Sequence, residues 1–210
     1  MLDIVQINLK KAFVATVELN RKIKNLNRYV ALTTEPYKFN GKIRSVPPKA
    51  NTICDTDPRA AIIYGGGLEL IKVDHLTSRD FAVGLLKTKT EKILIASVYL
   101  DIKEAVVQQW LEDFIEFANK KNYPVLIGMD SNAHSTLYGP DSNRRGEMLE
   151  EFIINNSLHI ENIGTSPTFE AFRREGLITS VIDVTLTKGL KEDVVGWKVC
   201  REYNLSLIHI

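Results

Sequence analysis

The sequence predicts a single α/β domain in which helices cover β-sheets. Strand-like and helix-like segments alternate at both ends of the chain, a run of strand-like segments lies between them, and the sequence contains no linker or internal repeat. The length of 210 residues, with 44% hydrophobic and 25% charged residues, is typical of a globular domain that buries a substantial core. Disordered and collagen-like chains are therefore excluded.

The first quarter of the chain begins with a strand and a helix. Residues 2–8 form a short apolar run that ends in polar residues, and residues 12–27 have the apolar spacing of an amphipathic helix. A second buried strand is expected over residues 29–34, where a proline soon stops it. Residues 36–58 contain four prolines and little periodicity, which predicts a long surface loop.

The middle of the chain predicts a meander of mainly antiparallel strands. Strand patterns cover residues 60–64, 68–73, 81–86 and 93–100. Gly65-Gly66-Gly67 is expected to form a tight hairpin between the first two strands, because no Lys-Ser/Thr or helix follows it as in a phosphate-binding loop.

The last part of the chain alternates helices and strands. Helices are predicted over residues 105–119 and 147–155, and strands over residues 124–130, 178–186 and 194–200.

Composition excludes several classes of protein. The sequence has no run of eighteen apolar residues, and polar residues interrupt its first eight positions, so we expect neither a membrane span nor a signal peptide. Cys54 and Cys200 lie far apart without zinc-site spacing, which predicts free, buried thiols in a reducing compartment.

The near-neutral charge of the chain conceals an asymmetry. Residues 1–50 contain ten Lys and Arg against three acidic residues, a net charge of +7, so the other 160 residues sum to −6. This distribution is compatible with a basic edge that faces a polyanion beside an acidic metal-binding region, although a solvated helix face explains Lys22 and Lys24 equally well.

Polar residues follow or end several predicted strands, which is where α/β folds build sites. A single Asp at a strand end is usually a turn former or a helix cap. As a set, carboxylates with further oxygen ligands suit Mg²⁺, while Asn and Tyr offer neutral donors to phosphate oxygens. The set comprises Asn8, Glu35, Tyr99, Asp130, Asn132 and Asp183.

These residues carry a family resemblance that covers nearly the whole chain. The sequence resembles the endonuclease/exonuclease/phosphatase family, and more closely the apurinic-endonuclease-like domain of LINE-type (non-LTR), site-specific retrotransposons. The resemblance implies a four-layered α/β sandwich in which two packed, mainly antiparallel β-sheets are flanked by helices. The motifs that carry it are Gln6-Ile7-Asn8, Thr34-Glu35-Pro36, Arg59-Ala60-Ala61-Ile62, Ser97-Val98-Tyr99, Gly128-Met129-Asp130-Ser131-Asn132-Ala133-His134, Ser166-Pro167-Thr168-Phe169 and Ser180-Val181-Ile182-Asp183.

The resemblance also implies roles for single residues. Glu35 and Asn8 would hold Mg²⁺, or Mn²⁺ in its place, with Glu35 as the principal ligand. Tyr99 would contact the scissile phosphate or help to orient the site. Asp130 would help to activate or position the attacking water, and Asn132 would donate to a non-bridging phosphate oxygen.

Further residues would contact substrate or support the catalytic histidine. Asp183 would accept a hydrogen bond from that histidine and hold its tautomer. Thr168 would lie at the rim of the cleft. For His134, a structural loop histidine is as good an interpretation as a DNA contact. The other DNA contacts expected are Arg145, Ser180 and Ser206.

The end of the sequence departs from the family pattern. The family ends this domain with Ser-Asp-His, whereas here Ser206 is followed by Leu207-Ile208-His209-Ile210. The expected domain therefore spans residues 1–206, with a tail at residues 207–210 that does not match. A shift of one residue turns a strand side chain to the other face, so His209 is not expected to replace the missing histidine.

The preferred function is a Mg²⁺-dependent endonuclease that nicks double-stranded target DNA in the nucleus and leaves a 3′-hydroxyl. A covalently linked reverse transcriptase in the full-length protein would use this hydroxyl as its primer, and no membrane partner is expected. The missing Asp-His leaves open that this fragment is inactive. Two alternatives remain: an apurinic endonuclease or phosphatase of the same fold, and a catalytically dead DNA-binding remnant.

Overall fold

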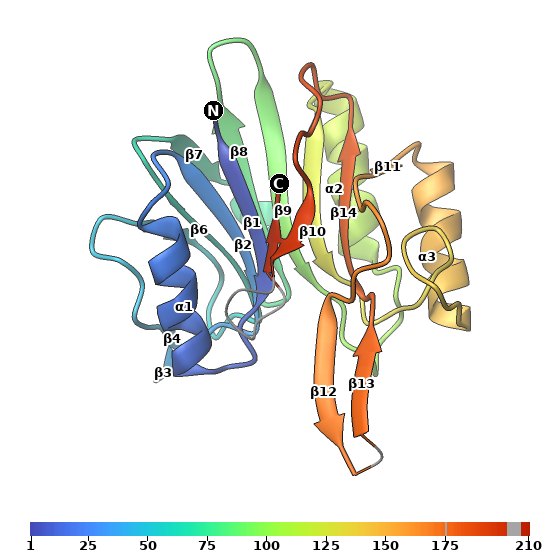
Figure 1. Ribbon diagram of the computed structural model, residues 1–210. Coiled ribbons are helices and arrows are strands. Elements are labelled where there is room, and N and C mark those ends of the chain that lie inside the picture. Colours follow the sequence, from blue (N-terminus) through green and yellow to red (C-terminus); the bar gives the residue numbers. More distant parts are fainter. Residues whose placement is uncertain (175, 201–206) are drawn as a thin grey trace.

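Two β-sheets pack face to face, and helices cover their outer faces, in a computed structural model that describes residues 1–174, 176–200 and 207–210 (Figure 1). The helices are α1 (Phe13–Ile23), α2 (Gln109–Lys121) and α3 (Arg144–Asn155), with a short 3-10 turn at Asp74–Leu76. Across the first sheet the order is β15 (Lys198–Cys200), β16 (Leu207–His209), β1 (Asp3–Asn8), β2 (Tyr29–Thr34), β6 (Ala60–Gly65) and β5 (Asn51–Ile53). Across the second it is β11 (His159–Ile160), β14 (Asp183–Lys188), β10 (Val125–Asp130), β9 (Lys92–Tyr99), β8 (Phe81–Lys87) and β7 (Glu69–Lys72). The four layers confirm the predicted α/β sandwich.

Three clusters of buried apolar side chains fill the spaces between the layers. Leu32 of the first sheet and Ile95 of the second belong to the cluster between the sheets. Leu19 of α1 packs on the outer face of the first sheet, and Phe114 of α2 with Leu149 of α3 packs on that of the second. The strands that are buried on both faces, such as β2 and β10, are therefore almost wholly apolar, as the sequence indicated.

Most predicted elements are present, and the differences are largest at helix ends. Residues 29–34 form a strand as predicted, whereas the first helix covers only Phe13–Ile23 of the predicted 12–27. The third helix begins earlier than predicted because Asn143 caps it, its Oδ1 accepting from the N–H of Gly146 at 2.8 Å.

The triple glycine does not form the predicted hairpin. It connects β6 of the first sheet to β7 of the second, so the predicted meander is confirmed only for β7, β8 and β9. Gly66 has φ +78°, and a Cβ there would lie 2.1 Å from the carbonyl oxygen of Asn27. A side chain at Gly66 would therefore block this close passage between the sheets.

Two further predictions about strands were wrong. Residues 36–58 are not simply a loop, because they contain the hairpin β3 (Lys38–Phe39) with β4 (Lys42–Ile43) as well as the edge strand β5. The predicted strand 178–186 is two strands, because residues 181–182 belong to neither and the chain changes its pairing partner there, from β12 (Phe169–Arg173) to β10. Its first part, β13 (Gly176–Ser180), pairs with β12 in a hairpin that projects beyond the sheets (Figure 1).

Residues 207–210 are not a loose tail. The strand β16 lies between β15 and β1 in the first sheet, and Leu207 and Ile208 are buried. Ser206 lies outside the described residues. Both cysteines are free, Cys200 buried and Cys54 partly so. Within the described residues, no helix is long and apolar enough to cross a membrane.

Candidate active site

The polar residues that end the strands meet at one edge of the sandwich. In the second sheet, Asp130 of β10 is the register partner of both Tyr99 of β9 and Asp183 of β14. In the first sheet, Asn8 of β1 pairs with Thr34 of β2, and Glu35 follows directly. Residues that are far apart in the sequence thus form two facing rows.

Asn8 joins the two rows by hydrogen bonds. Its Nδ2 donates to Asp130 Oδ2 at 2.6 Å and to Glu35 Oε2 at 3.2 Å, while its Oδ1 accepts from the N–H of Lys10 at 2.7 Å. The amide oxygen of Asn8 thus accepts one hydrogen bond and keeps a second lone pair. In this arrangement Asn8 positions the two carboxylates, and its expected role as a Mg²⁺ ligand stays a prediction.

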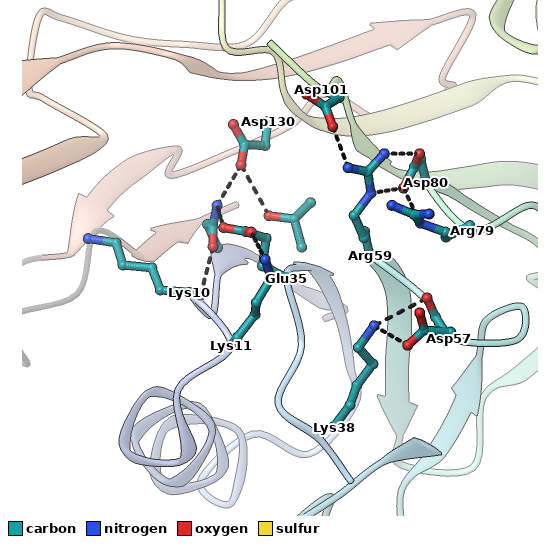
Figure 2. Close-up of polar contacts among 12 residues, drawn as sticks. Lys10, Lys11, Glu35, Lys38, Asp57, Arg59, Arg79, Asp80, Asp101 and Asp130 are labelled. Carbon is teal, nitrogen blue, oxygen red and sulfur yellow. Dashed lines mark hydrogen bonds and ion pairs between the residues drawn. The ribbon is translucent and has the colours of Figure 1, made fainter. Parts of the chain in front are cut away.

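Glu35 is held in an unusual backbone conformation. Its φ is +45°, a region that non-glycine residues seldom adopt, and its N–H donates to the carbonyl oxygen of Arg59 at 2.7 Å. Lys11 Nζ lies 3.1 Å from Glu35 Oε1 (Figure 2). Such strained positions concentrate at functional sites, where the surrounding structure holds them in place.

Asp130 is more deeply buried than Glu35, and only 2% of its surface is exposed. Burial raises the pKa of Asp130 to about 6 and the charge of Glu35 adds to the rise, although the hydrogen bond from Asn8 opposes it. Thr34 Oγ1 also donates to Oδ2 at 3.4 Å, whereas Oδ1 is buried without any hydrogen-bond partner among the described residues. An unpaired buried oxygen of this kind is costly unless a ligand satisfies it.

Asp183 lies beside Asp130 and is equally enclosed. Burial, and then the charge of Asp130, raise the pKa of Asp183 well above its usual range, against hydrogen bonds from Thr168 and Gln6. Thr168 is itself buried, and its Oγ1 accepts from the N–H groups of Ile182 and Asp183 at 3.0 Å each. Thr168 is thus a support for Asp183 inside the fold, and not a residue of the cleft rim as expected.

Tyr99 has a contact that the sequence did not reveal. The guanidinium of Arg59 lies 4.8 Å from the centre of the Tyr99 ring. Burial, together with the carboxylates of Glu35, Asp130 and Asp101, raises the pKa of Tyr99 to about 12. The Tyr99 hydroxyl therefore stays protonated at neutral pH and can donate a hydrogen bond to an anion.

The residues expected to contact DNA differ in their exposure and in the hydrogen bonds that they already make within the protein. Arg145 donates to five backbone carbonyl oxygens, those of Asn132, Ile102, Glu104, Asp101 and Ser131. Its guanidinium is thereby committed to holding two loops together, so the expected DNA contact is not available in this structure. His134 and Ser180 are partly exposed, and Ser180 accepts from the N–H of Thr168 at 2.9 Å.

Asn132 also has a structural engagement. It follows β10 with φ +46°, and its Nδ2 donates to the carbonyl oxygen of Leu100 at 3.0 Å. One amide hydrogen is thus used within the fold, and the other is left to serve a ligand.

Comparisons with known proteins agree with this geometry. The sequence profile of the endonuclease-reverse transcriptase family matches residues 93–206, which is more than half of the chain. The chain belongs to this family.

Relatives of known structure and function are similar to this family member along its whole length. It is 26% identical to the endonuclease domain of TRAS1, a telomere-specific non-LTR retrotransposon, with a TM-score of 0.84 over 100% of this chain and 97% of that one. An apurinic endonuclease from Archaeoglobus fulgidus shares the fold, with 12% identity, a TM-score of 0.65 and coverage of 100% and 99%. The family resemblance and the predicted fold are both confirmed.

A longer relative places the domain in context. The chain is 25% identical, over 199 residues, to a 115 kDa protein in type-1 retrotransposable element R1DM of Drosophila melanogaster. The match covers 89% of this chain but only 19% of that protein, so the chain spans about a fifth of the relative's length.

The donor set of this endonuclease-reverse transcriptase family member fits a hard divalent cation. Glu35 and Asp130 offer carboxylate oxygens, and the unpartnered Oδ1 of Asp130 is a vacant buried acceptor. The part of the chain that the structure describes contains no cluster of three or more His, Cys, Asp or Glu side chains arranged for a metal. Two carboxylates with water in the remaining positions suit Mg²⁺, which keeps several waters, better than Zn²⁺.

The register of β16 shows on which face of the first sheet Leu207, Ile208 and His209 lie. Ile208 pairs with Gln6, whose side chain reaches Met129 and Thr185 of the second sheet, so position 208 faces the side that carries Asn8. Leu207 faces α1 instead, within the outer cluster. His209 Nε2 lies 3.1 Å from Asp3 Oδ1, on the opposite face from Asn8. It therefore does not supply the site with an imidazole here.

Proposed function

We propose that this chain is the Mg²⁺-dependent DNA endonuclease domain of a non-LTR retrotransposon protein, and that it nicks one strand of duplex target DNA to leave a 3′-hydroxyl. The observation that carries the proposal is the partly buried hydrogen-bond network of Asn8, Glu35 and Asp130, in which one buried oxygen of Asp130 is left unpaired. A covalently linked reverse transcriptase and action in the nucleus are part of the same proposal, and rest on the similarity to the retrotransposon proteins.

Each residue of the site has a task in this reaction. Glu35 and Asp130 would hold the cation, which would supply positive charge against the negative charge of the phosphodiester. Asn8 fixes the distance between the two carboxylates. The protonated hydroxyl of Tyr99 donates to a phosphate oxygen, and the free amide hydrogen of Asn132 donates to another.

The remaining requirement is a group that exchanges a proton with water or with the leaving oxygen. Asp183 is placed to orient an imidazole, but the chain has a buried isoleucine at position 208, on the face where the family's histidine is needed. This observation favours a second candidate function, in which the chain binds DNA without cleaving it.

DNA is expected to lie across the edge of the sandwich that carries the site. Several neighbouring residues are basic, including Lys10 and Lys11, and residues 1–50 carry a net charge of +7. The projecting hairpin β12–β13 stands beside the site: Lys10 Nζ donates to the carbonyl oxygen of Glu170 and lies 5.1 Å from the centre of the Phe169 ring. Phe172 on this hairpin is 87% exposed, which suits contact with a groove.

A plasmid-nicking experiment separates the candidates. Supercoiled plasmid is incubated with the parent, with Ile208→His, and with the double variant Leu207→Asp/Ile208→His, in Mg²⁺ and in EDTA. We expect Mg²⁺-dependent nicking by Ile208→His and at most slow nicking by the parent. Adding Glu35→Ala to Ile208→His should abolish cleavage and leave the protein folded.

Other outcomes would contradict the proposal in distinct ways. Folded proteins that all bind DNA with a steep salt dependence but never nick it would support the binding-only function. Nicking restricted to duplexes that carry an abasic site would support an apurinic endonuclease. Unchanged nicking by the Glu35→Ala version would refute the assignment of Glu35 as the principal ligand.

A further inference from the structure

Arg59 connects three loops at the edge of the candidate active site. It precedes β6, and its guanidinium contacts the carboxylates of Asp80, just before β8, and Asp101, just after β9 (Figure 2). The contact with Asp80 is bidentate, through Nε and Nη2. Only 13% of the Arg59 side chain is exposed, so these ion pairs are largely screened from water.

The same cluster holds Tyr99 from two sides. The guanidinium of Arg59 lies over the Tyr99 ring at 4.8 Å, and the N–H of Tyr99 donates to the carbonyl oxygen of Asp80 at 2.9 Å. A ring that packs against a planar cation, itself fixed by two carboxylates, has little freedom to rotate away.

The backbone of Arg59 belongs to the first sheet, where it extends the pairing of β6 with β2. Its carbonyl oxygen accepts the N–H of Glu35 at 2.7 Å, and Glu35 is the residue that the site holds with a left-handed φ. One residue therefore contacts both Glu35 of the first sheet's row and Tyr99 of the second sheet's row.

A direct role in binding DNA does not fit Arg59. The hydrogen bonds that Arg59 donates to the Asp80 carboxylate, and then to that of Asp101, raise the pKa of Arg59, and two negative charges surround its single positive charge. A phosphate would have to displace one carboxylate to reach the guanidinium. The exposed Arg79, whose Nε lies 3.7 Å from Asp80 Oδ1, is better placed for such a contact.

We propose that Arg59 is a positioning residue for the reaction: it sets the place of the Tyr99 hydroxyl relative to Glu35 across the two sheets. The inference rests on the proposed endonuclease function, in which Tyr99 donates to the scissile phosphate. Arg59 acts through Tyr99 and does not itself touch the substrate.

The test uses the Ile208→His protein and adds Arg59→Met, Arg59→Lys and the control Lys38→Met. Lys38 is a matched control because its side chain is 18% exposed and it forms the neighbouring ion pair with Asp57 at 2.6 Å (Figure 2). We expect Arg59→Met to lower the rate constant for nicking at saturating DNA by about tenfold, with the half-saturating DNA concentration changed less than twofold. Arg59→Lys, which keeps the charge without the planar stack, should recover part of the rate, and Lys38→Met should stay within twofold of the parent.

A double-mutant cycle with Tyr99→Phe identifies the path of the effect. If Arg59 acts through the Tyr99 hydroxyl, then Arg59→Met causes no further loss of rate in the Tyr99→Phe protein. Additive losses would overturn the proposal, as would an equal loss in Lys38→Met. Should Arg59→Met fail to fold, the same cycle is run with Arg59→Lys.

A second readout does not depend on activity. In protein labelled with ¹³C at tyrosine rings, the Tyr99 ring signals are expected to move in Arg59→Met or Arg59→Lys and to stay in place in Lys38→Met. Unmoved signals would refute the positioning role even if nicking fell. If no version nicks DNA yet the Tyr99 signals move, the endonuclease proposal fails while the placement of Tyr99 by Arg59 is supported.

Discussion

Replacing Asp130 by asparagine is expected to stabilise the protein at neutral pH while it removes the activity. Asp130 is 2% exposed, and burial raises its pKa from 3.8 to about 6. At a pH between these two pKa values, Asp130 is protonated in the folded state and ionised in the unfolded state. The free energy of unfolding must therefore fall as the pH rises through this window.

The fall in the free energy of unfolding can be calculated from the rise in the pKa of Asp130. Each pKa unit corresponds to about 1.4 kcal/mol, so the ionised Asp130 costs the folded state about 3 kcal/mol above pH 6. An asparagine has nearly the same shape, and its oxygen can still accept from Asn8 Nδ2, which now lies 2.6 Å from Asp130 Oδ2. Asp130→Asn should thus raise the free energy of unfolding by about 1 to 3 kcal/mol at pH 7.5, and by much less at pH 4.5.

The measurement is urea unfolding of parent and variant in EDTA at both pH values, with the exposed Asp141→Asn as a matched control. The control should change the free energy of unfolding by less than about 0.5 kcal/mol at either pH. Addition of Mg²⁺ should stabilise the parent and not Asp130→Asn, because the variant has lost a ligand charge. A difference between variant and parent that is the same at both pH values, or a less stable variant at pH 7.5, would refute the reasoning.

Three further predictions concern stability. Leu207 is buried against α1, so Leu207→Asp should lower the free energy of unfolding by about 3 kcal/mol or more, whereas Leu207→Met should cost less than about 1.5 kcal/mol in the same urea titration. Gly66→Ala meets a backbone carbonyl oxygen at 2.1 Å and should cost more than about 2 kcal/mol; Gly67→Ala, with an equally positive φ but open space around it, should cost only about 1 kcal/mol, and equal costs would contradict the close passage. Arg145→Ala leaves five backbone carbonyl oxygens without their donor and should lower the free energy of unfolding by about 2 to 4 kcal/mol. The control Arg144→Ala, at an exposed neighbouring residue, should change it by less than about 0.5 kcal/mol. A larger loss in Arg144→Ala than in Arg145→Ala would refute the structural role of Arg145.

A loss of stability in the Leu207→Asp/Ile208→His variant could by itself prevent nicking. The double variant Leu207→Asp/Ile208→His restores the family's Asp-His, but it places a carboxylate in the cluster beneath α1. Ile208→His alone changes only the face that carries Gln6 and Asn8. Thermal unfolding of both versions should therefore be compared before a lack of nicking is attributed to chemistry.

Much of the fold could be predicted from the sequence because its signals are local. The buried strands at residues 29–34 and 125–130 are short apolar runs bounded by polar residues, and both are strands in the structure. Helix ends were predicted less well, since the apolar stripe continues past the last helical turn in residues 24–27. The hairpin β12–β13 was missed because its residues have no buried face to give them a strand pattern.

The membership of each strand in a sheet could not be predicted from local pattern. A glycine turn between two apolar runs favours a hairpin, but here the chain crosses from the first sheet to the second and passes close to the carbonyl oxygen of Asn27 at Gly66. Likewise, Thr168 and Arg145 have the residue types of surface contacts. Both were predicted to meet DNA, and both are used inside the fold.

The sequence by itself determined that this protein is an α/β domain and which strand ends carry its polar residues, because strand period and residue type are readable position by position. The two-sheet nuclease-type fold was predicted from the family resemblance that its motifs carry. The tertiary structure alone decided how those residues are used. Asn8 orients carboxylates from both sheets, and Arg59 ties Glu35 to Tyr99, through contacts between residues that are 24 to 122 positions apart. Such contacts depend on how two twisted sheets pack and on which donors burial leaves without water, and no local pattern in the chain contains that information.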